Sequence, residues 1–128
     1  MAEGTGPAQD GIEGIRRDPI TGVERNGSSV VVALAGELDL YNAHTLRETL
    51  LECCDEGPER LVVDLSEVRF IDSTALGVLI EARTRMPNRR GFLLAAPGLE
   101  TRRALEISGL DRHFAVHSSL DEALAAPV

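Results

Sequence analysis

Residues 70–79 read Phe-Ile-Asp-Ser-Thr-Ala-Leu-Gly-Val-Leu, a short apolar run that ends in Asp-Ser-Thr and passes at once into an apolar helical pattern. This order predicts a strand followed directly by a helix that begins at about Ser73. A hydroxyl group then lies at a helix N-terminus, where unpaired backbone N–H groups and the helix dipole favour added negative charge. The junction is therefore a suitable place for a phosphate group that is added and removed.

Strand and helix patterns alternate along the rest of the chain. Residues 26–27, Asn-Gly, form a hairpin-turn dipeptide, and residues 66–70 are predicted as a connection. The alternation predicts an α/β fold with one mixed β-sheet of about five strands packed with about four helices, in which the opening hairpin is antiparallel and the inner strands are parallel. The predicted strands cover residues 22–25, 29–37, 61–65, 91–96 and 114–117, and the predicted helices cover residues 41–55, 73–85, 99–108 and 120–126.

Length and composition predict one folded domain preceded by a tail. At 128 residues the chain is large enough for a single core, and 43% of its residues are hydrophobic. Residues 1–21 are rich in glycine and proline and offer little to a core. We therefore expect a flexible N-terminal tail over residues 1–21 and the folded domain over residues 22–126.

Charge and hydropathy exclude several classes of protein. The net charge of −8 argues against binding to nucleic acid and to anionic membranes, and the arginine pairs at residues 89–90 and 102–103 are interpreted as solvated charge. No apolar run approaches the roughly 20 residues that span a bilayer, and the N-terminus lacks the pattern of a secretory signal. The adjacent Cys53 and Cys54 predict reduced thiols. Together these features predict a cytoplasmic protein.

Two roles are open for Ser73 when only its neighbours are considered. Serine is common as a helix N-cap, but Ser73 is also a candidate phosphoacceptor, which would place almost two negative charges beside Asp72. A nucleophilic serine is less well supported, because its flanking residues are Ile71 and Ala75 where a nucleophile elbow has glycines. We therefore predict no catalytic residue.

Acidic residues follow several of the predicted strands. Because the carboxyl ends of parallel strands meet at one edge of a sheet, Glu37, Asp39, Asp64 and Asp72 could form a Mg²⁺ or phosphoryl site. The whole chain contains no lysine, which weakens the phosphoryl site of a receiver domain. The simpler interpretation makes Asp39, or else Asn42, the cap of the first helix and Asp64 a strand end. No metal site and no cofactor is predicted.

Several segments taken together resemble the STAS domain family, and more narrowly the bacterial anti-sigma factor antagonists. The segments are VVALAGELD at residues 31–39, LVVDL at 61–65, FIDSTALGVL at 70–79, and ISGL at 107–110 followed by Phe114. Gly-Glu-Leu-Asp combined with a downstream Asp-Ser-Thr-x-Leu-Gly is specific, whereas either motif alone is weak. The resemblance covers residues 22–125 and implies the family's mixed sheet packed with helices.

The resemblance implies a regulator that is not an enzyme. In such antagonists the unmodified protein binds an anti-sigma factor that is also an ATP-dependent serine kinase, and this binding frees the sigma factor. The kinase phosphorylates the serine that follows the aspartate, here Ser73, so that the partner is released, and a metal-dependent serine phosphatase restores the unmodified form. The residues that match the partner-binding region are Asp39, Asp72, Ser73, Thr74, Leu76 and Gly77.

Two other functions stay open at this point. The first is a STAS-domain scaffold or accessory protein, in a stress complex or in lipid or anion transport, that works without a phosphorylation switch. The second is an esterase or a nucleotide hydrolase, which rests only on scattered acidic residues and one well-placed serine.

Overall fold

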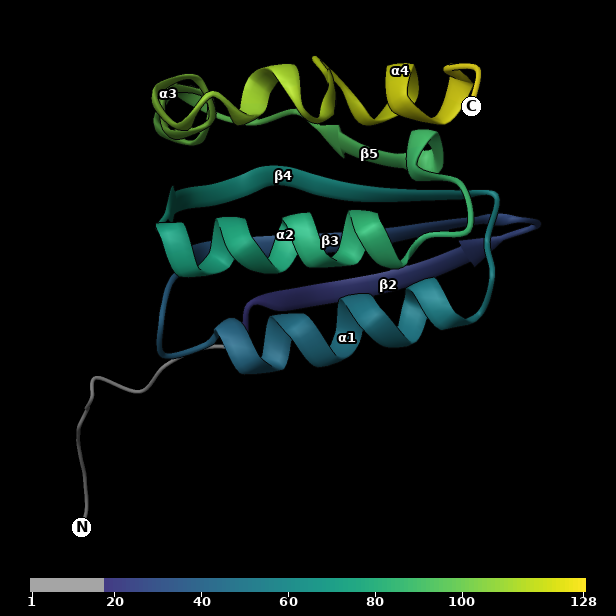
Figure 1. The fold of residues 1–128 in the computed structure, drawn as a ribbon, viewed down its shortest axis with the longest axis horizontal. Helices are drawn as coiled ribbons and strands as arrows, with labels where there is room; N and C mark the ends of the chain where they lie inside the picture. Colours follow the sequence, from purple (N-terminus) through teal and green to yellow (C-terminus); the bar gives the residue numbers. More distant parts are fainter. Residues whose placement is uncertain (1–17) are drawn as a thin grey trace, which may run out of the picture.

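The sheet is arranged around β4 (Arg60–Ile71), a strand of twelve residues. In this computed structural model, which describes residues 18–128, five strands lie in the order β2-β3-β4-β5-β6 (Figure 1). β2 and β3 are antiparallel, whereas β3, β4, β5 and β6 run parallel to one another, which confirms the predicted mixed sheet. The other strands are β2 (Ile20–Asn26), β3 (Ser29–Leu38), β5 (Phe92–Ala95) and β6 (Ala115–His117).

Helices cover both faces of the sheet to different extents. α1 and α2 lie in front of the sheet in Figure 1 and bury their apolar side chains against β3 and β4. α4 packs Ala123 against Val62 and Leu93 on the other face, and α3 contacts β4 and adds Leu105 to the main core. Within residues 18–128 the helices are α1 (Ala43–Asp55), α2 (Ser73–Arg85), α3 (Leu99–Ser108) and α4 (Leu120–Ala125), with short 3₁₀ turns η2 (Arg89–Gly91) and η3 (Leu110–Arg112).

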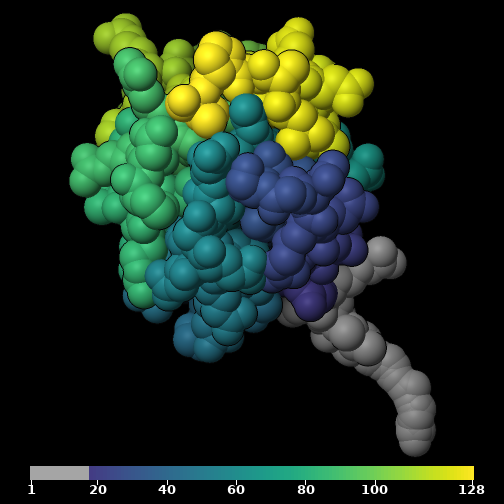
Figure 2. All heavy atoms as spheres, turned by 90° about the vertical axis from the view of Figure 1, so that its right-hand side faces the viewer, coloured from purple at the N-terminus to yellow at the C-terminus, as the bar shows by residue number. Residues whose placement is uncertain are grey.

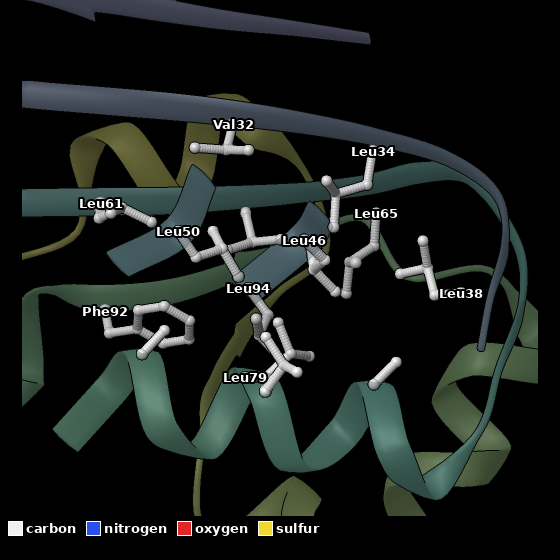
Figure 3. Close-up of a cluster of buried hydrophobic side chains, with 14 of the residues drawn as sticks. Val32, Leu34, Leu38, Leu46, Leu50, Leu61, Leu65, Leu79, Phe92 and Leu94 are labelled. Atoms are coloured by element: carbon white, nitrogen blue, oxygen red, sulfur yellow. The ribbon is translucent and has the colours of Figure 1, made fainter. Parts of the chain in front are cut away.

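The main core lies between the sheet and the pair of helices α1 and α2. Figure 3 shows leucine side chains from β3, β4 and α1 gathered above those of α2. Burial of each leucine contributes about 1.5–3 kcal/mol relative to exposure, so this cluster is a principal source of stability. Its largest fully buried members include Val32, Leu34, Leu38, Leu46, Leu50, Leu61, Leu65, Leu79, Phe92 and Leu94.

β4 is longer than the sequence predicts, because residues 66–70 form a strand and not a connection. β3 pairs with β4 as far as Leu38 and Ile71, and the register shifts twice along this pairing. Each shift adds a residue to β4, so the buried positions Leu65, Val68 and Ile71 recur at every third residue instead of every second. Without the two-residue alternation, the segment has no strand pattern in the sequence.

The start of β2 differs from the predicted boundary, whereas the end of α3 agrees with it. Residues 1–17 of the predicted tail lie outside the described residues, whereas Ile20 and Thr21 already belong to β2. β2 begins earlier than predicted because Ile20 packs against the main core. α3 ends at Gly109 as predicted, and Gly109 has the left-handed backbone (φ 78°) that glycine adopts readily.

The two ends of the sheet carry different parts of the chain. The β3–α1 loop and the start of α2 lie at the left-hand end in Figure 1. The end of α2, the η2 turn and the C-terminal residues lie at the right-hand end, which faces the viewer in Figure 2. Ser73 begins α2 and Arg83 lies in its last turn, so the 13-residue helix separates them by roughly 15 Å at about 1.5 Å per residue.

Replacement of Gly91 by alanine is expected to destabilise the fold. A Cβ atom at Gly91 would collide with the backbone carbonyl of Glu59, which cannot move aside as the end of a flexible side chain does. We expect Gly91→Ala to lower the free energy of unfolding by about 1–3 kcal/mol in a urea titration.

Gly77→Ala is the matched control. Gly77 lies within α2 with open space around it, so the same substitution should raise the free energy of unfolding by up to about 1 kcal/mol. Equal stability of the Gly91→Ala variant and the original chain would show that the close approach of η2 to the Glu59 backbone is not required.

Candidate functional site

Asp72, and not Ser73, is the N-cap of α2. The Asp72 Oδ1 atom accepts a hydrogen bond from the Ala75 N–H at 3.0 Å, and its Oδ2 atom accepts one from the Leu40 N–H at 3.1 Å. The Asp72 N–H donates to the Leu38 carbonyl at 3.0 Å. One aspartate therefore joins the strand-to-helix junction to the β3–α1 loop, and the capping role proposed for Ser73 belongs to its neighbour.

Ser73 is the first residue of α2, and its side chain is exposed. Its hydroxyl has no hydrogen-bond partner within residues 18–128, because Asp72 already fulfils the capping role. Thr74 and Gly77 are exposed beside it on the first turns of the helix. The Ser73 hydroxyl is therefore accessible to an enzyme, and a phosphate attached to it would lie at a helix N-terminus.

Leu76 is not exposed with Ser73, Thr74 and Gly77 on the first turns of α2. Only 7% of Leu76 is exposed, and its side chain packs in the main core with Ala75 and Leu79. These residues share the face of α2 that rests on the sheet, as helical spacing dictates. The structure therefore removes Leu76 from the predicted partner-binding residues as a direct contact and makes it a support for the exposed first turn.

The predicted acidic rim does not form. Asp64 lies opposite Ala95 at the end of β5 and accepts a hydrogen bond from the Ser66 N–H at 3.0 Å. From Asp64, β4 continues for several residues beyond the end of β5 before it reaches Asp72. Within residues 18–128 no three His, Cys, Asp or Glu side chains are grouped so that they could hold a metal ion. The long second half of β4 is the reason that Asp64 lies away from Glu37, Asp39 and Asp72, which are at the far end of β3 and β4.

The β3–α1 loop is held in place by its own polar side chains. The Asp39 carboxylate accepts a hydrogen bond from the Tyr41 N–H at 3.0 Å. The Asn42 side chain accepts one from the Asp39 N–H at 2.9 Å and donates one to the Glu37 carbonyl at 2.7 Å. Asn42 is the N-cap residue of α1, which is one of the two predicted alternatives, although its side chain makes no capping hydrogen bond. α1 therefore begins at Ala43 and not at residue 41.

Three apolar side chains are exposed near this site, although none of them is among the predicted partner-binding residues. Leu40 is 66% exposed and Tyr41 is 81% exposed in the β3–α1 loop, and Phe70 is 49% exposed at the end of β4. Leu40 is joined to Asp72 by a hydrogen bond, and Phe70 is two residues before Asp72 in the chain. We call Leu40, Tyr41, Phe70, Ser73 and Thr74 the switch surface. Large apolar residues that are exposed near one site are typical of a protein interface.

The sequence contains a weak signal for one of these apolar residues. Tyr41 falls outside the helical series of Ala43, Leu46 and Leu50, whereas Leu40 lies three residues before Ala43 and fits that series. Tyr41 is also the single tyrosine in a chain that has only 3% aromatic residues. A large side chain that fits no amphipathic pattern, such as Tyr41, is a candidate for an exposed contact.

The two cysteines of the chain lie in the main core. Cys53 and Cys54 are buried free thiols, as predicted, and burial raises the pKa of the Cys54 thiol to about 11. A thiol with so high a pKa is a poor nucleophile near neutral pH. None of the helices between residues 18 and 128 combines the length and the apolar character that crossing a bilayer requires.

A family model described as the STAS domain matches residues 21–123. The chain belongs to the STAS domain family. Its four segments of resemblance all lie within the matched range, which confirms the prediction from the sequence.

Relatives of this STAS domain are named as anti-sigma factor antagonists. It is 35% identical over 105 residues to the anti-sigma-F factor antagonist RsfB of Mycobacterium tuberculosis, covering 82% of this chain and 85% of the relative. It is 36% identical over 90 residues to the anti-sigma-B factor antagonist of Bacillus subtilis, covering 69% of this chain and 81% of the relative. The crystal structure of an anti-sigma factor antagonist from Mycobacterium paratuberculosis matches with a TM-score of 0.77 and 34% identity over 85% of this chain and 94% of that one.

Removal of the Asp72 carboxylate is expected to destabilise the start of α2 and the β3–α1 loop. Asp72→Ala loses the cap on α2 and the bond to the Leu40 N–H, so we expect the free energy of unfolding to fall by about 1–3 kcal/mol. In a hydrogen-exchange measurement the Leu40 amide should exchange faster than in the original chain.

Ser73→Ala is the control for this prediction. The Ser73 hydroxyl has no partner within residues 18–128, so its removal should change the free energy of unfolding by no more than about 0.5 kcal/mol. A larger loss from Ser73→Ala than from Asp72→Ala would reverse the roles assigned to the two residues.

Proposed function

We propose that this STAS domain is an anti-sigma factor antagonist whose unmodified form binds an anti-sigma factor and whose binding is abolished by phosphorylation of Ser73. The observation that carries the proposal is the exposed Ser73 hydroxyl at the start of α2, next to the loop and strand end that carry the exposed apolar residues Leu40, Tyr41 and Phe70. The names of the relatives support the same class of partner.

The switch surface has the composition expected of a docking site. Leu40 and Tyr41 supply apolar area, and the hydrogen bonds of Asp72 and Asn42 hold the loop that carries them. A loop that is already ordered loses little conformational entropy when a partner binds. The surface therefore provides the partner with preformed apolar contacts around a modifiable hydroxyl.

Phosphorylation would change the charge of this surface while leaving the fold in place. A phosphate on Ser73 adds about −1.5 to −2 charge beside the Asp72 carboxylate, and no hydrogen bond of the described fold involves the hydroxyl that it replaces. The helix N-terminus stabilises such a charge by about 0.3–1 kcal/mol. Burial of an unpaired dianion in an apolar interface costs several kcal/mol, so release of the partner dominates.

The proposed partners follow from this mechanism. The anti-sigma factor is also the serine kinase that modifies Ser73, and a serine phosphatase returns the protein to its binding form. Contacts with these partners are assigned to Asp39, Asp72, Ser73, Thr74 and Gly77. The protein acts by binding and not by catalysis, and it acts in the cytoplasm, where the sigma factor is used.

Addition of a charge at Ser73 is expected to abolish binding. With the cognate anti-sigma factor, Ser73→Ala should bind as tightly as the original chain, whereas Ser73→Asp should bind at least about tenfold more weakly, which corresponds to about 1.4 kcal/mol. Isothermal titration calorimetry measures both affinities. Thr84→Asp is the matched control, because it adds the same charge to an exposed position at the far end of α2.

The phosphorylation step itself is tested in a lysate of the host bacterium supplied with ATP. Immobilised protein is used to capture partners, and tandem mass spectrometry locates phosphate on the bait. A co-purifying serine kinase and phosphate on Ser73 are the expected result. An unmodified Ser73 together with components of a stress complex or of a membrane transport system would favour a STAS scaffold or accessory protein instead.

The apolar part of the switch surface gives a separate prediction. Tyr41→Ser should weaken binding to the anti-sigma factor by about tenfold or more, because aromatic side chains near the centre of an interface contribute disproportionately to affinity. Ile107→Ser is the control, since Ile107 on α3 is as exposed as Tyr41, at 81%, but does not belong to the switch surface. Equal losses of affinity in the two variants would contradict the position assigned to the interface.

A further inference from the structure

Four arginines surround a hollow at the opposite end of α2 from Ser73. The hollow has a volume of about 540 Å³, and Arg83, Arg89, Arg90 and Arg112 are among the residues that line it. They come from the last turn of α2 and from the turns η2 and η3. In Figure 2 the green segment that follows α2 lies beside the yellow C-terminal residues at this end of the molecule. We call these four arginines and the hollow the basic groove.

The arginines of the basic groove differ from most others in the described chain. Within residues 18–128 none of the four pairs with a carboxylate, and the nearest polar contact of Arg83 is the His113 Nε2 atom at 3.5 Å. Five other arginines each pair with a carboxylate of the chain, namely Arg25, Arg47, Arg69, Arg85 and Arg103.

The charge of the whole protein makes this arrangement unusual. The chain has a net charge of −8, so carboxylates are in excess, yet none of those described lies close enough to pair with these four guanidinium groups. Four like charges around one hollow repel each other, and an added anion relieves that repulsion. The cluster is therefore suited to receive negative charge from another molecule.

A strand edge next to the groove favours an extended ligand. Ala115, the first residue of β6, lines the hollow, and within residues 18–128 β6 pairs only with β5. The second edge of a strand that has one neighbour carries backbone groups to which an extended peptide can add. Side chains of such a peptide alternate in direction, so acidic residues on one side of it can reach the arginines.

We propose that the basic groove binds an extended acidic segment of a partner protein, which pairs with the edge of β6 and places its carboxylates against Arg83, Arg89, Arg90 and Arg112. Single-stranded nucleic acid is the alternative ligand, but the phenylalanine rings that line the hollow, Phe92 and Phe114, are buried and offer it no stacking surface. The proposal does not depend on the function proposed for Ser73, which lies at the other end of α2.

The test uses a fluorescein-labelled peptide in which glutamate and valine alternate, titrated with the full chain and followed by fluorescence anisotropy. The same peptide with glutamine in place of glutamate is the control ligand. We expect only the glutamate peptide to bind, and we expect its affinity to fall as the ionic strength is raised to about 0.15 M. In NMR spectra of the unmodified protein, the amide shifts should be largest at residues 89–91 and 115–117.

A matched pair of double variants locates the site. R89Q/R90Q removes two charges from the groove, and R102Q/R103Q removes the same number from exposed adjacent positions on α3. R89Q/R90Q should bind the glutamate peptide about tenfold more weakly than the original chain does. R102Q/R103Q should bind the peptide with the affinity of the original chain. Thermal melting followed by circular dichroism checks that both variants fold.

Three results would overturn the proposal. The first is a failure of the glutamate peptide to bind at low ionic strength. The second is an equal loss of affinity in both double variants, or amide shifts that fall on the switch surface instead of the groove. The third is tighter binding of a single-stranded oligonucleotide of the same charge, which would assign the groove to nucleic acid. If R89Q/R90Q fails to fold, the NMR shifts of the original chain locate the peptide-binding site.

Discussion

The carboxylate of Asp72 holds together the two segments from which the candidate site is built. One oxygen accepts from the Ala75 N–H at the start of α2, and the other accepts from the Leu40 N–H in the β3–α1 loop. The Asp72 N–H also donates to the Leu38 carbonyl at the end of β3. Because these bonds occupy the capping position, the Ser73 hydroxyl is left exposed, and the positions of Leu40 and Tyr41 depend on the same aspartate.

This arrangement favours a switch in surface chemistry over a change of shape. The sheet, α2 and the β3–α1 loop are connected by backbone groups and by Asp72, and none of these bonds uses the Ser73 side chain. The hydrogen bonds that hold these elements together are therefore kept when Ser73 is modified. In the proposed switch, the cost of the added charge would fall on the interface with the partner, where desolvation of a phosphate outweighs the modest stabilisation from the helix dipole.

α2 also separates two surfaces of opposite character. Its first turn contributes Ser73 and Thr74 to an apolar surface, and its last turn contributes Arg83 to the basic groove. Roughly 15 Å of helix lies between them at about 1.5 Å of rise per residue. The two surfaces therefore lie at opposite ends of the same helix.

The sequence by itself determined the features that depend on near neighbours. The α/β class and the bounds of α2 and α3 follow from helical periodicity and end signals, which act within a few residues, and the motif located Asp72 and Ser73. Only the tertiary structure decided that residues 66–70 continue β4, since their bulged pairing is defined by β3 and not by their own alternation. It also decided that Leu76 is buried while Tyr41 is exposed, because the exposure of a side chain depends on which distant segments pack over it.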